Sequence, residues 1–597
     1  MCGIIGYAGP SGDALDVLLT GLEGLEYRGY DSAGVALANG SLDVCKREGE
    51  IQRLLRAVDG DLGGPAGIGH TRWSTHGPPS DQNAHPHTDC TGEVAVVHNG
   101  IIENYDALRA ELVEKGHEFD SETDTEVVPH LIEDALAAGK SPEDAFREAV
   151  SQLEGSYALA AVFEGSDAVL ATRDGSPLVV GVGDDAAYLA SDVPAFLDYT
   201  DKVVYLEDGE FARLENGAWG VTDRGGRLLN KSVSQVEWDA EETAKSGYDH
   251  YMLKEIHEQP RALRQCLRGR VDEMTGSVNL EELGELEPSE VQFVACGTSY
   301  NAALYATQLL HEEGIPAQAF LASEYATSPP PVQEGTLVVG ITQSGETADT
   351  LAALRSVANH GVETLAVTNV VGSTVARGCD RAMYIRSGPE IGVAATKTFS
   401  AQAVAANLVA LSLTGQTRKS REVVEALRNL PGQVQEILDS SRAEEVAERF
   451  LDSEAYFFIG RECHYPVALE GALKMKEITY KHAEGFAAGE LKHGPLALVT
   501  GETPVFAVVT GDGEPATKTI GNVKEVEARD APVVAVTDGR SDVARYAEEV
   551  LEVPETHPRL APVLANVQLQ LVSYYVAKEL GRSIDKPRNL AKSVTVE

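Results

Sequence analysis

The chain has 597 residues, enough for several domains that each bury their own hydrophobic core. Hydrophobic residues make up 43% of it, and no stretch approaches the roughly 20 consecutive apolar residues of a membrane span. The net charge of −44, from 93 acidic and 49 basic residues, excludes a nucleic-acid-binding protein, which needs the opposite sign.

The acidic residues are spread along the chain rather than gathered in a tail, as on a solvated surface. Such a charge helps solubility but repels itself at low salt, which favours a salt-rich cytoplasm. The amino terminus also lacks the basic, then apolar, then small-residue order of a secretory signal. We therefore expect a soluble cytoplasmic protein.

Cysteines and histidines form no metal-binding pattern. The seven cysteines are scattered, odd in number and without a C-x-x-C pair, which argues against a disulfide framework or a zinc knuckle. Neither an HExxH spacing nor a carboxylate partner accompanies the five histidines that crowd one region, His70, His76, His85, His87 and His98. We expect no metal site.

The first 220 or so residues are rich in strand signals with interspersed helices. Short apolar runs at 93–98, 157–163 and 178–182 predict strands, and the first of them ends in the turn signal Asn99-Gly100. Because regular intervening helices are missing, an α+β domain with two packed sheets fits better than a parallel sheet.

Composition becomes charged and strand signals stop between Trp238 and Pro260, which we interpret as a linker running into a helix. From about residue 280 the pattern changes to strand–turn–helix units, and a second series repeats the first. The predicted strands lie at 291–297, 337–341 and 363–369, and again at 455–460, 504–510 and 532–537. This pattern predicts two repeated α/β domains with parallel sheets.

Cys2 is the most informative position, because removal of Met1 would give it a free α-amino group. An α-amino group has a pKa of about 7.7–8.0 and a thiol one of about 8.5, so the amine can accept the thiol proton near neutral pH. A nucleophile and its base would then lie in one residue. An inert core thiol is the alternative for Cys2 taken alone.

A thiolate that attacks an amide needs hydrogen-bond donors for the developing oxyanion, which the Asn99 side chain and the Gly100 amide can supply. An amino-acid substrate also needs a cation and an anion. Arg72 can hold its carboxylate through paired hydrogen bonds, and Asp124 can hold its ammonium group. Taken separately, Asn99-Gly100 also fits a hairpin turn, and Arg72 a surface cation.

Five segments resemble the class II glutamine amidotransferases, a family of N-terminal-nucleophile enzymes: Cys2-Gly3-Ile4, YRGYDSAG (27–34), HTRWSTHG (70–77), HNGIIEN (98–104) and SETDTE (121–126). The resemblance implies an αββα sandwich that releases ammonia from glutamine. It implies Cys2 as the nucleophile and an oxyanion hole of Asn99 and Gly100. It also implies four glutamine-binding residues, Arg72, Thr75, His76 and Asp124.

Two segments of the second half suit an anion such as phosphate. The segment 342–347 (TQSGET) places hydroxyls, an amide and backbone N–H groups at a helix N-terminus, and 296–299 (CGTS) opens the preceding helix similarly. An ordinary N-cap is the alternative for each. Neither contains GxGxxG or GxxxxGK[ST], so we expect no dinucleotide, no nucleoside triphosphate and no cofactor.

Charged residues then recur at helical spacing. Glu470, Lys474 and Glu477 fall on one helical face, for which a solvated charge ladder is the alternative. The irregular segment that follows contains His493, a residue suited to proton transfer.

These segments, with the tail DKPRNLAKSVTVE (585–597), resemble the sugar-isomerase domains of the glutamine–fructose-6-phosphate aminotransferase family, and the match covers essentially the whole chain. The resemblance implies that fructose 6-phosphate takes up ammonia and isomerises to glucosamine 6-phosphate in a homodimer. Lys592 would form a Schiff base with the sugar, and Glu477 would move a proton between C1 and C2, with Lys474 nearby. His493, supplied by the neighbouring subunit, would open the sugar ring.

The resemblance also implies a sugar-phosphate site and a gate. The site would comprise Ser299, Thr342, Gln343, Ser344, Thr347 and Val393. Trp73 would gate an ammonia channel between the active sites. Thr342 and Ala395 stand where the family pattern usually has serine. Thr342 keeps the hydroxyl, whereas Ala395 lowers sugar affinity if that serine contacts sugar through its side chain.

The predicted domains follow from both resemblances. They are an amidotransferase domain at 2–220, a linker and connecting helix at 221–279, sugar-isomerase domains at 280–420 and 446–587, and a tail at 588–597. We expect the tail, which has apolar residues and no acidic run, to be docked rather than free.

Two other functions fit only parts of the sequence. A purine-pathway amidotransferase or an asparagine synthetase needs a phosphoribosyltransferase or ATP-binding half, and neither pattern appears. A phosphosugar-sensing transcription regulator would not need Cys2, Arg72 and Asn99. It would also bring a basic DNA-binding segment, which a net charge of −44 argues against.

Overall fold

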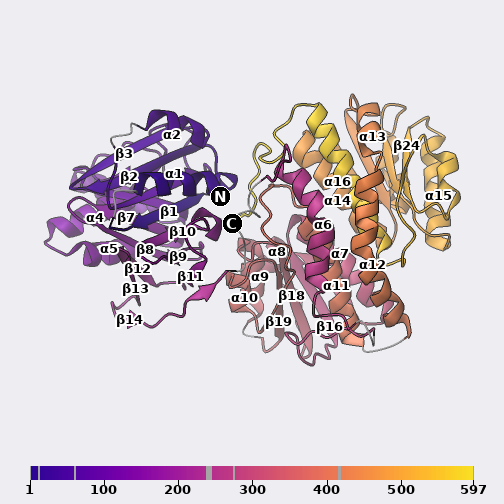
Figure 1. The fold of residues 1–597 in the computed structure, drawn as a ribbon, viewed down its shortest axis with the longest axis horizontal. Coiled ribbons are helices and arrows are strands. Elements are labelled where there is room, and N and C mark those ends of the chain that lie inside the picture. Colours follow the sequence, from indigo (N-terminus) through magenta and orange to yellow (C-terminus); the bar gives the residue numbers. More distant parts are fainter. Residues whose placement is uncertain are drawn as a thin grey trace. The chain divides into compact units, whose positions relative to one another are not determined.

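The computed structural model describes residues 2–10, 14–58, 62–236, 245–272, 276–358, 360–414 and 418–595. The chain forms two compact units, residues 1–244 with 591–597, and residues 245–590 (Figure 1). Met1 and part of the predicted linker lie outside the described residues. Among the described helices, none combines the length and apolar character needed to cross a membrane.

The first unit contains two antiparallel sheets. One has the strand order β15-β11-β9-β10-β1-β4-β2-β3 and the other β14-β13-β12-β8-β7-β6-β5. The strands are β1 (Gly3–Ala8), β2 (Ser32–Asn39), β3 (Ser41–Glu48), β4 (Ala66–Arg72), β5 (His87–Thr88), β6 (Val94–Ile102), β7 (Gly155–Phe163), β8 (Ala168–Asp174), β9 (Val179–Val182), β10 (Ala187–Ala190), β11 (Lys202–Tyr205), β12 (Phe211–Glu215), β13 (Ala218–Thr222), β14 (Leu228–Leu229) and β15 (Ser234–Gln235). The predicted pair of sheets is confirmed.

The hydrophobic clusters show four layers in this unit. Ile4 and Ile68 of one sheet share a core with Val97 and Ala160 of the other. The outer faces are covered by helices, one by α1 and α2 and the other by α3, α4 and α5. These helices and two short 3-10 helices are α1 (Ala14–Leu25), α2 (Ile51–Ala57), α3 (Tyr105–Lys115), α4 (Val127–Ala137), α5 (Pro142–Val150), η1 (Glu26–Arg28) and η2 (Val193–Ala195). The arrangement is the expected αββα sandwich.

Asn99-Gly100 is not a hairpin turn, and that interpretation is wrong. Strand β6 continues through both residues and pairs with β7 from Val94 to Ile102. Gly100 has φ of +130°, and a Cβ atom there would lie 1.9 Å from the carbonyl oxygen of Ser156. The position therefore requires glycine for steric reasons, and the pair lies inside the sheet.

The second unit contains two parallel sheets of identical topology. Their orders are β17-β16-β18-β19-β20 and β22-β21-β23-β24-β25, which confirms the predicted repeat. The strands are β16 (Glu290–Ala295), β17 (Ala317–Leu321), β18 (Thr336–Thr342), β19 (Glu363–Thr368), β20 (Arg381–Tyr384), β21 (Ala455–Gly460), β22 (His482–Ala487), β23 (Val505–Val508), β24 (Val533–Thr537) and β25 (Glu549–Glu552). The central strands are buried along nearly their whole length, as expected when helices cover both faces.

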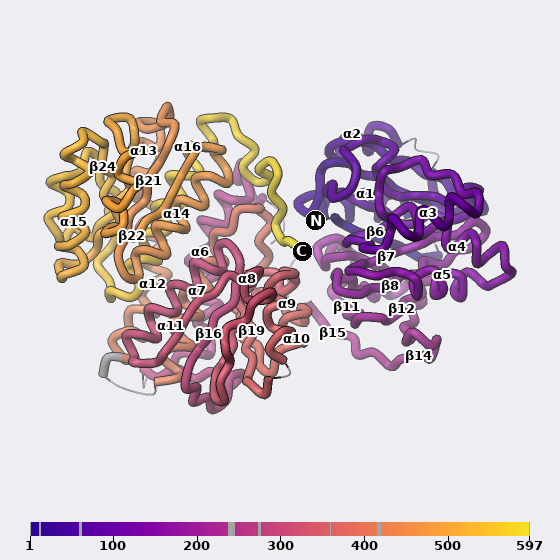
Figure 2. The backbone as a smooth tube through the Cα atoms, turned by 180° about the vertical axis from the view of Figure 1, so that it is seen from behind, coloured from indigo at the N-terminus to yellow at the C-terminus, as the bar shows by residue number. Residues whose placement is uncertain are grey.

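One hydrophobic core joins the two parallel sheets through the helices between them (Figure 2). The helices of this unit are α6 (Tyr251–Leu267), α7 (Gly297–Glu312), α8 (Ala322–Thr327), α9 (Ala348–Val357), α10 (Thr374–Gly378), α11 (Lys397–Thr414), α12 (Arg418–Ser440), α13 (Ala443–Arg449), α14 (His464–Thr479), α15 (Glu514–Glu527) and α16 (Ala561–Glu579), with 3-10 helices η4 (Ala488–His493), η5 (Pro495–Leu498) and η6 (Asp542–Tyr546). Helix α16 is buried almost all round, which explains why it is apolar on every face.

Candidate functional site

Cys2 lies at the amino end of β1, where the pairing of Gly3 with Thr71 places it beside the end of β4. The Trp73 amide donates a hydrogen bond to the Cys2 sulfur at 3.2 Å, and the sulfur lies 3.5 Å from the Trp73 carbonyl oxygen. Burial raises the pKa of the Cys2 thiol, although the Trp73 amide and the Arg72 charge oppose this shift. The thiol therefore needs a base before it can attack.

The YRGYDSAG segment holds the chain at Arg72 and Trp73 in place. The Asp31 amide donates to the Arg72 carbonyl oxygen at 3.0 Å, and the Asp31 carboxylate accepts from the Ser74 amide at 2.8 Å. A Cβ atom at Gly29 would lie 2.6 Å from the Arg72 carbonyl carbon, so the close approach requires glycine. This motif thus supports the site rather than forming its chemical centre.

Three predicted glutamine-binding residues lie close together in sequence: Arg72 ends β4, and Thr75 and His76 lie in the loop that follows. The Arg72 guanidinium donates to the carbonyl oxygens of His76 and Gly77. Its Nη1 is buried without a hydrogen-bond partner among the described residues, so it can still bind a carboxylate. His76 Nδ1 lies 3.3 Å from the Thr75 hydroxyl and 3.9 Å from the Asp124 carboxylate.

His70 positions Asn99 beside Cys2. Its Nε2 lies 2.9 Å from the His98 carbonyl oxygen and 3.1 Å from Asn99 Oδ1, so this nitrogen carries the hydrogen. Burial lowers the pKa of His70 to about 3, which keeps the ring neutral. The Asn99 amide nitrogen consequently points the other way and donates to the Cys2 carbonyl oxygen at 2.9 Å. We did not predict a role for His70, although it begins the HTRWSTHG motif.

Asp124 is held at the end of β6, where its carboxylate accepts from the Ile102 amide at 2.8 Å and lies 3.9 Å from His98 Nδ1. Trp73, the predicted gate, packs edge-on against Tyr30 at 5.6 Å between ring centroids. The structure thus gathers four predicted residues of the first unit around Cys2, namely Arg72, Trp73, Asn99 and Asp124, and His76 lies next to Asp124.

The buried histidines of this unit predict acid sensitivity. Burial lowers the pKa of His70 to about 3 and holds those of His85 and His87 well below their usual range. Below about pH 6.5 the unfolded chain binds these protons and the folded unit does not, so stability falls as the pH falls. We expect each histidine to remove up to about 1.4 kcal/mol of unfolding free energy per pH unit below that value.

All three tryptophans of the chain precede residue 245, so tryptophan fluorescence reports on the first unit. Denaturant unfolding at pH 7 and at lower pH measures how much the free energy of unfolding falls per pH unit. His85→Gln is expected to make this decrease smaller. A free energy of unfolding that does not change on acidification contradicts the prediction.

The predicted sugar-phosphate residues lie at one edge of the first parallel sheet. Neighbouring strands β16 and β18 lead there into α7 and α9, and the strand order reverses between them. Open α/β sheets bind ligands at such a point, outside the carboxyl ends of the strands. Ser299 lies in the first turn of α7, where its hydroxyl accepts from Gln402 at 3.0 Å, and 342–347 joins β18 to α9.

Hydroxyls and amides converge in the loop 342–347. The Thr342 hydroxyl lies 2.9 Å from the Thr347 hydroxyl and accepts from the Gly345 amide at 3.3 Å. The Ser344 hydroxyl accepts a hydrogen bond from the Glu346 amide at 3.1 Å. Gly345 has φ of +70°, and a Cβ atom there would lie 2.1 Å from Ser373 Oγ. The loop therefore requires glycine, and the Thr342 hydroxyl makes its contacts within the loop.

Backbone hydrogen bonds place Gln343 and Val393. The Gln343 carbonyl oxygen accepts from the Asn369 amide at 3.1 Å, and the Val393 amide donates to the Asp585 carbonyl oxygen at 3.0 Å. The Asp585 carboxylate accepts the first two amides of α6, both at 3.0 Å. The DKPRN segment thus connects α6 to the loop that carries Val393.

The predicted charge ladder on α14 is buried, so its interpretation as a solvated face is wrong. The Lys474 ammonium lies 2.6 Å from the Glu477 carboxylate and 3.4 Å from that of Glu470, and the side chains of Lys474 and Glu470 are 0% exposed. Thr298 and Asn301 of α7 complete the network, since both donate to Glu470, at 3.0 and 2.8 Å. Thr298 also accepts from Lys474 at 3.1 Å.

This network connects the two α/β repeats. Thr298 precedes Ser299 in the first turn of α7, so the helix that carries the predicted phosphate-binding residue Ser299 near its start also contacts Lys474 of the second repeat. The two carboxylates raise the pKa of Lys474 against the effect of burial. The raised pKa favours the protonated, positively charged form of Lys474.

Glu390 is a residue that we did not predict. Its carboxylate accepts from the amides of Thr396 and Thr398, at 3.0 and 3.1 Å, and from the Thr398 hydroxyl at 2.7 Å. It also contributes negative charge at Lys474. Glu390 thereby holds the end of the segment 392–396 (GVAAT), which contains Val393 and Ala395, and only its position just before that segment could have indicated this.

Two predicted residues are not gathered in this network. His493 is exposed at the end of η4. Lys592 belongs to the terminal segment that groups with the first unit. Their catalytic roles, like those of the other site residues, remain predictions.

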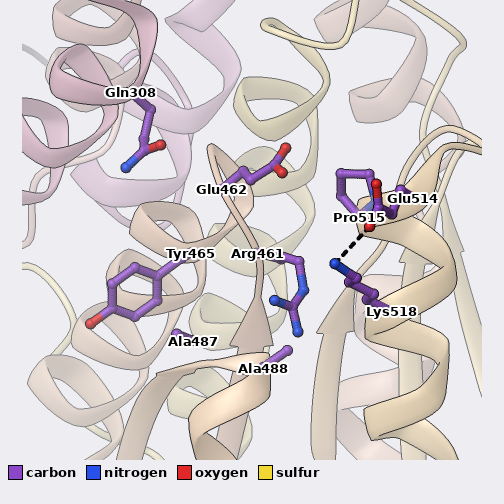
Figure 3. A pocket seen from close by; sticks show the side chains of 9 residues that line it. All are labelled: Gln308, Arg461, Glu462, Tyr465, Ala487, Ala488, Glu514, Pro515 and Lys518. Atoms are coloured by element: carbon purple, nitrogen blue, oxygen red, sulfur yellow. Dashed lines mark ion pairs between the residues drawn. The ribbon is translucent and has the colours of Figure 1, made fainter. Parts of the chain in front are cut away.

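A cavity of about 410 Å³ opens at the carboxyl edge of the second parallel sheet (Figure 3). It is lined by Gln308, Arg461, Glu462, Tyr465, Ala487, Ala488, Glu514, Pro515 and Lys518. Lys518 pairs with Glu514 at 2.7 Å. No residue of the predicted sugar-phosphate set is among these lining residues. This cavity is therefore separate from the edge of the first parallel sheet where those residues lie.

Comparisons with known proteins cover both units. The SIS domain family matches residues 287–412 and 450–579, and the glutamine amidotransferase domain family matches residues 70–198. The glutamine–fructose-6-phosphate aminotransferases (isomerizing) of Halobacterium salinarum and Methanosarcina acetivorans are 52% and 48% identical to this chain. Both alignments cover 100% of each sequence.

Among solved structures, the C-terminal domain of glucosamine-fructose-6-phosphate aminotransferase from Francisella tularensis resembles the second half. It aligns with a TM-score of 0.54 and 38% identity, over 58% of this chain and 100% of its own. The similarity thus extends to the three-dimensional arrangement of the parallel-sheet domains.

Proposed function

The chain belongs to the family of glutamine–fructose-6-phosphate aminotransferases (isomerizing), and we propose that its two units divide the family reaction between them. The enzyme transfers the amide nitrogen of glutamine to fructose 6-phosphate and isomerises the product to glucosamine 6-phosphate, with release of glutamate. One observation supports the assignment of the two half-reactions to different units. Arg72, Asn99 and Asp124 surround Cys2 in the first unit, whereas Lys474 and Glu477 lie beside the phosphate edge in the second.

In the first unit, the Cys2 thiolate attacks the side-chain carbonyl carbon of glutamine. The free α-amine takes the thiol proton and passes it to the leaving nitrogen, so ammonia departs and a thioester remains. Asn99, held by neutral His70, and the Gly100 amide stabilise the negative oxygen that forms during attack, which in other enzymes is worth about 2.7–4 kcal/mol per donor. Water then hydrolyses the thioester to glutamate.

Recognition of glutamine rests on opposite charges. The unpartnered Arg72 Nη1 binds the α-carboxylate, and Asp124 binds the α-ammonium group. Thr75 and His76 complete the loop that covers the substrate. Trp73, whose backbone contacts Cys2 directly, gates the passage of ammonia out of this site.

In the second unit, the loop 342–347 and Ser299 hold the phosphate of fructose 6-phosphate at the start of two helices. We assign the Schiff base to Lys592 of the terminal segment, which groups with the first unit: its amine condenses with the C2 carbonyl and releases water, and ammonia then displaces the lysine nitrogen. Glu477 removes a proton from C1 and returns it to C2, which converts the ketose imine into the amino sugar. Lys474 fixes the Glu477 carboxylate, and Val393 contacts the sugar.

His493 opens the sugar ring. Its exposure fits a residue that completes the site of a second copy of the chain, and we therefore propose a homodimer. We also propose that the enzyme acts in the cytoplasm. The substrates are glutamine and fructose 6-phosphate, with neither a nucleic acid nor a membrane as a partner.

Internal transfer of nitrogen is tested with glutamine labelled at the amide nitrogen, fructose 6-phosphate and an excess of unlabelled ammonium. We expect glucosamine 6-phosphate to carry the label almost undiluted and to form together with glutamate. Mass spectrometry of the amino sugar measures the label. Dilution by ammonium contradicts internal transfer, and glutamate without amino sugar contradicts the function.

A further inference from the structure

Four side chains with metal-ligand atoms lie close together in the first unit, and none of them belongs to the residues described around Cys2. Cys90 follows β5, His117 follows α3, and His130 and Glu133 lie on α4. One ligand atom from each lies within 4.8 Å of every other. None of the five histidines that crowd the sequence between 70 and 98 belongs to this cluster.

The distances suit a tetrahedral ion. The Cys90 sulfur lies 3.6 Å from His117 Nδ1 and 3.6 Å from His130 Nδ1. Zinc bonds of about 2.3 Å to sulfur and about 2.0–2.1 Å to nitrogen place those atoms about 3.6 Å apart at the tetrahedral angle. Glu133 Oε2 lies 3.0 and 3.2 Å from the same two nitrogens, slightly closer than the about 3.4 Å expected around zinc.

One of the two histidines also has a carboxylate acceptor at its other ring nitrogen. His117 Nε2 lies 2.9 Å from Asp134 Oδ1, whereas His130 Nε2 lies 3.9 Å from Glu126 Oε1, beyond hydrogen-bond distance. Histidines that bind metals almost always donate their other ring N–H to such an acceptor, which fixes the tautomer and the ring orientation. This second observation is independent of the ligand distances and also indicates a metal.

We propose that Cys90, His117, His130 and Glu133 bind one zinc ion in each chain. Binding replaces the thiol proton of Cys90, which passes to solvent, and forms four coordinate bonds to the ion. Four protein ligands leave no open position, so the site is structural rather than catalytic. Exposed Cys90 provides the route of entry.

The ion would join three segments that are distant in sequence. It connects the loop after β5 and the end of α3 to α4, and α4 directly follows the SETDTE segment that carries Asp124. Zinc is therefore expected to raise the temperature at which the first unit unfolds, and a chelator to lower it. The proposal does not depend on which reaction the chain catalyses.

The test uses the full-length protein stripped with a chelator and titrated with cobalt(II), then with zinc. We expect a thiolate-to-cobalt charge-transfer absorption that saturates at one ion per chain and disappears as zinc displaces cobalt. Cys90→Ser is expected to remove this absorption, and the exposed position makes the variant compatible with folding. Asp134→Asn is expected to weaken metal binding about 10- to 100-fold, because it removes the acceptor behind His117.

Two matched controls exclude other thiols. Cys2→Ala and Cys45→Ser remove cysteines of the same unit that lie outside the cluster, and both are expected to keep the absorption. The proposal is overturned if the wild type shows no charge-transfer absorption, if the absorption survives Cys90→Ser, or if it is lost with Cys2→Ala.

Discussion

Replacing Cys2 with alanine is expected to reduce glutamine hydrolysis at least about a thousandfold, because removal of a nucleophile leaves only binding and the oxyanion donors. The fold should survive, since residues Gly3–Ala8 of β1, and not Cys2, make the pairing with β4. Glutamate release is measured with and without fructose 6-phosphate. Formation of glucosamine 6-phosphate from glutamine should fall equally, because its nitrogen comes from this step.

Cys45→Ala is the matched control, since Cys45 is a half-buried thiol of the same unit on β3. It is expected to retain full activity. Retained glutaminase activity in Cys2→Ala would exclude Cys2 as the nucleophile. An intact mass that shows Met1 still present on active enzyme would instead exclude the α-amine as the base.

Much of this site could be predicted because its residues lie in short, dense motifs. Arg72 ends a strand that pairs with the one after Cys2, and Trp73 follows it directly, so a single pairing joins two motifs about 70 positions apart. The parallel sheets were predictable for a related reason. Their strands are continuous apolar runs that are followed by turn residues and helices. The whole series of strands and helices then occurs a second time.

Local signals failed where tertiary contacts decide the outcome. Asn99-Gly100 has the composition of a hairpin turn. However, β6 pairs with β7 before, at and after these two residues, so the strand continues through them. Lys474 and Glu477 have the spacing of a solvated ladder, yet α7 covers that face of α14 and makes it a buried network. Spacing along one element cannot show which other element packs against it.

The cluster around Cys90 illustrates the same limit. Its ligands come from three segments, and Cys90 and Glu133 are 43 residues apart. Their spacing matches no short metal-binding motif, so the sequence led us to expect no metal. Only folding brings α4 and the loop after β5 together.

Replacing Lys592 with arginine is expected to abolish formation of glucosamine 6-phosphate while glutamine hydrolysis remains measurable. Arginine keeps the positive charge but cannot supply a neutral amine, so no Schiff base forms with the sugar carbonyl. Borohydride reduction in the presence of fructose 6-phosphate should attach the sugar covalently to the wild type and not to the variant, which mass spectrometry detects. Lys586→Arg, also near the carboxyl terminus, is the matched control and should still be labelled.

The two halves of this result test different claims. A sugar adduct on Lys592→Arg would show that another lysine forms the Schiff base. Loss of both activities, in a variant that unfolds at the same denaturant concentration as the wild type, would show that the chemistry is not divided between two sites. If the wild type is labelled at Lys592 and Lys592→Arg still hydrolyses glutamine, the two reactions occur at separate sites. The transferred nitrogen is then the only species that links them.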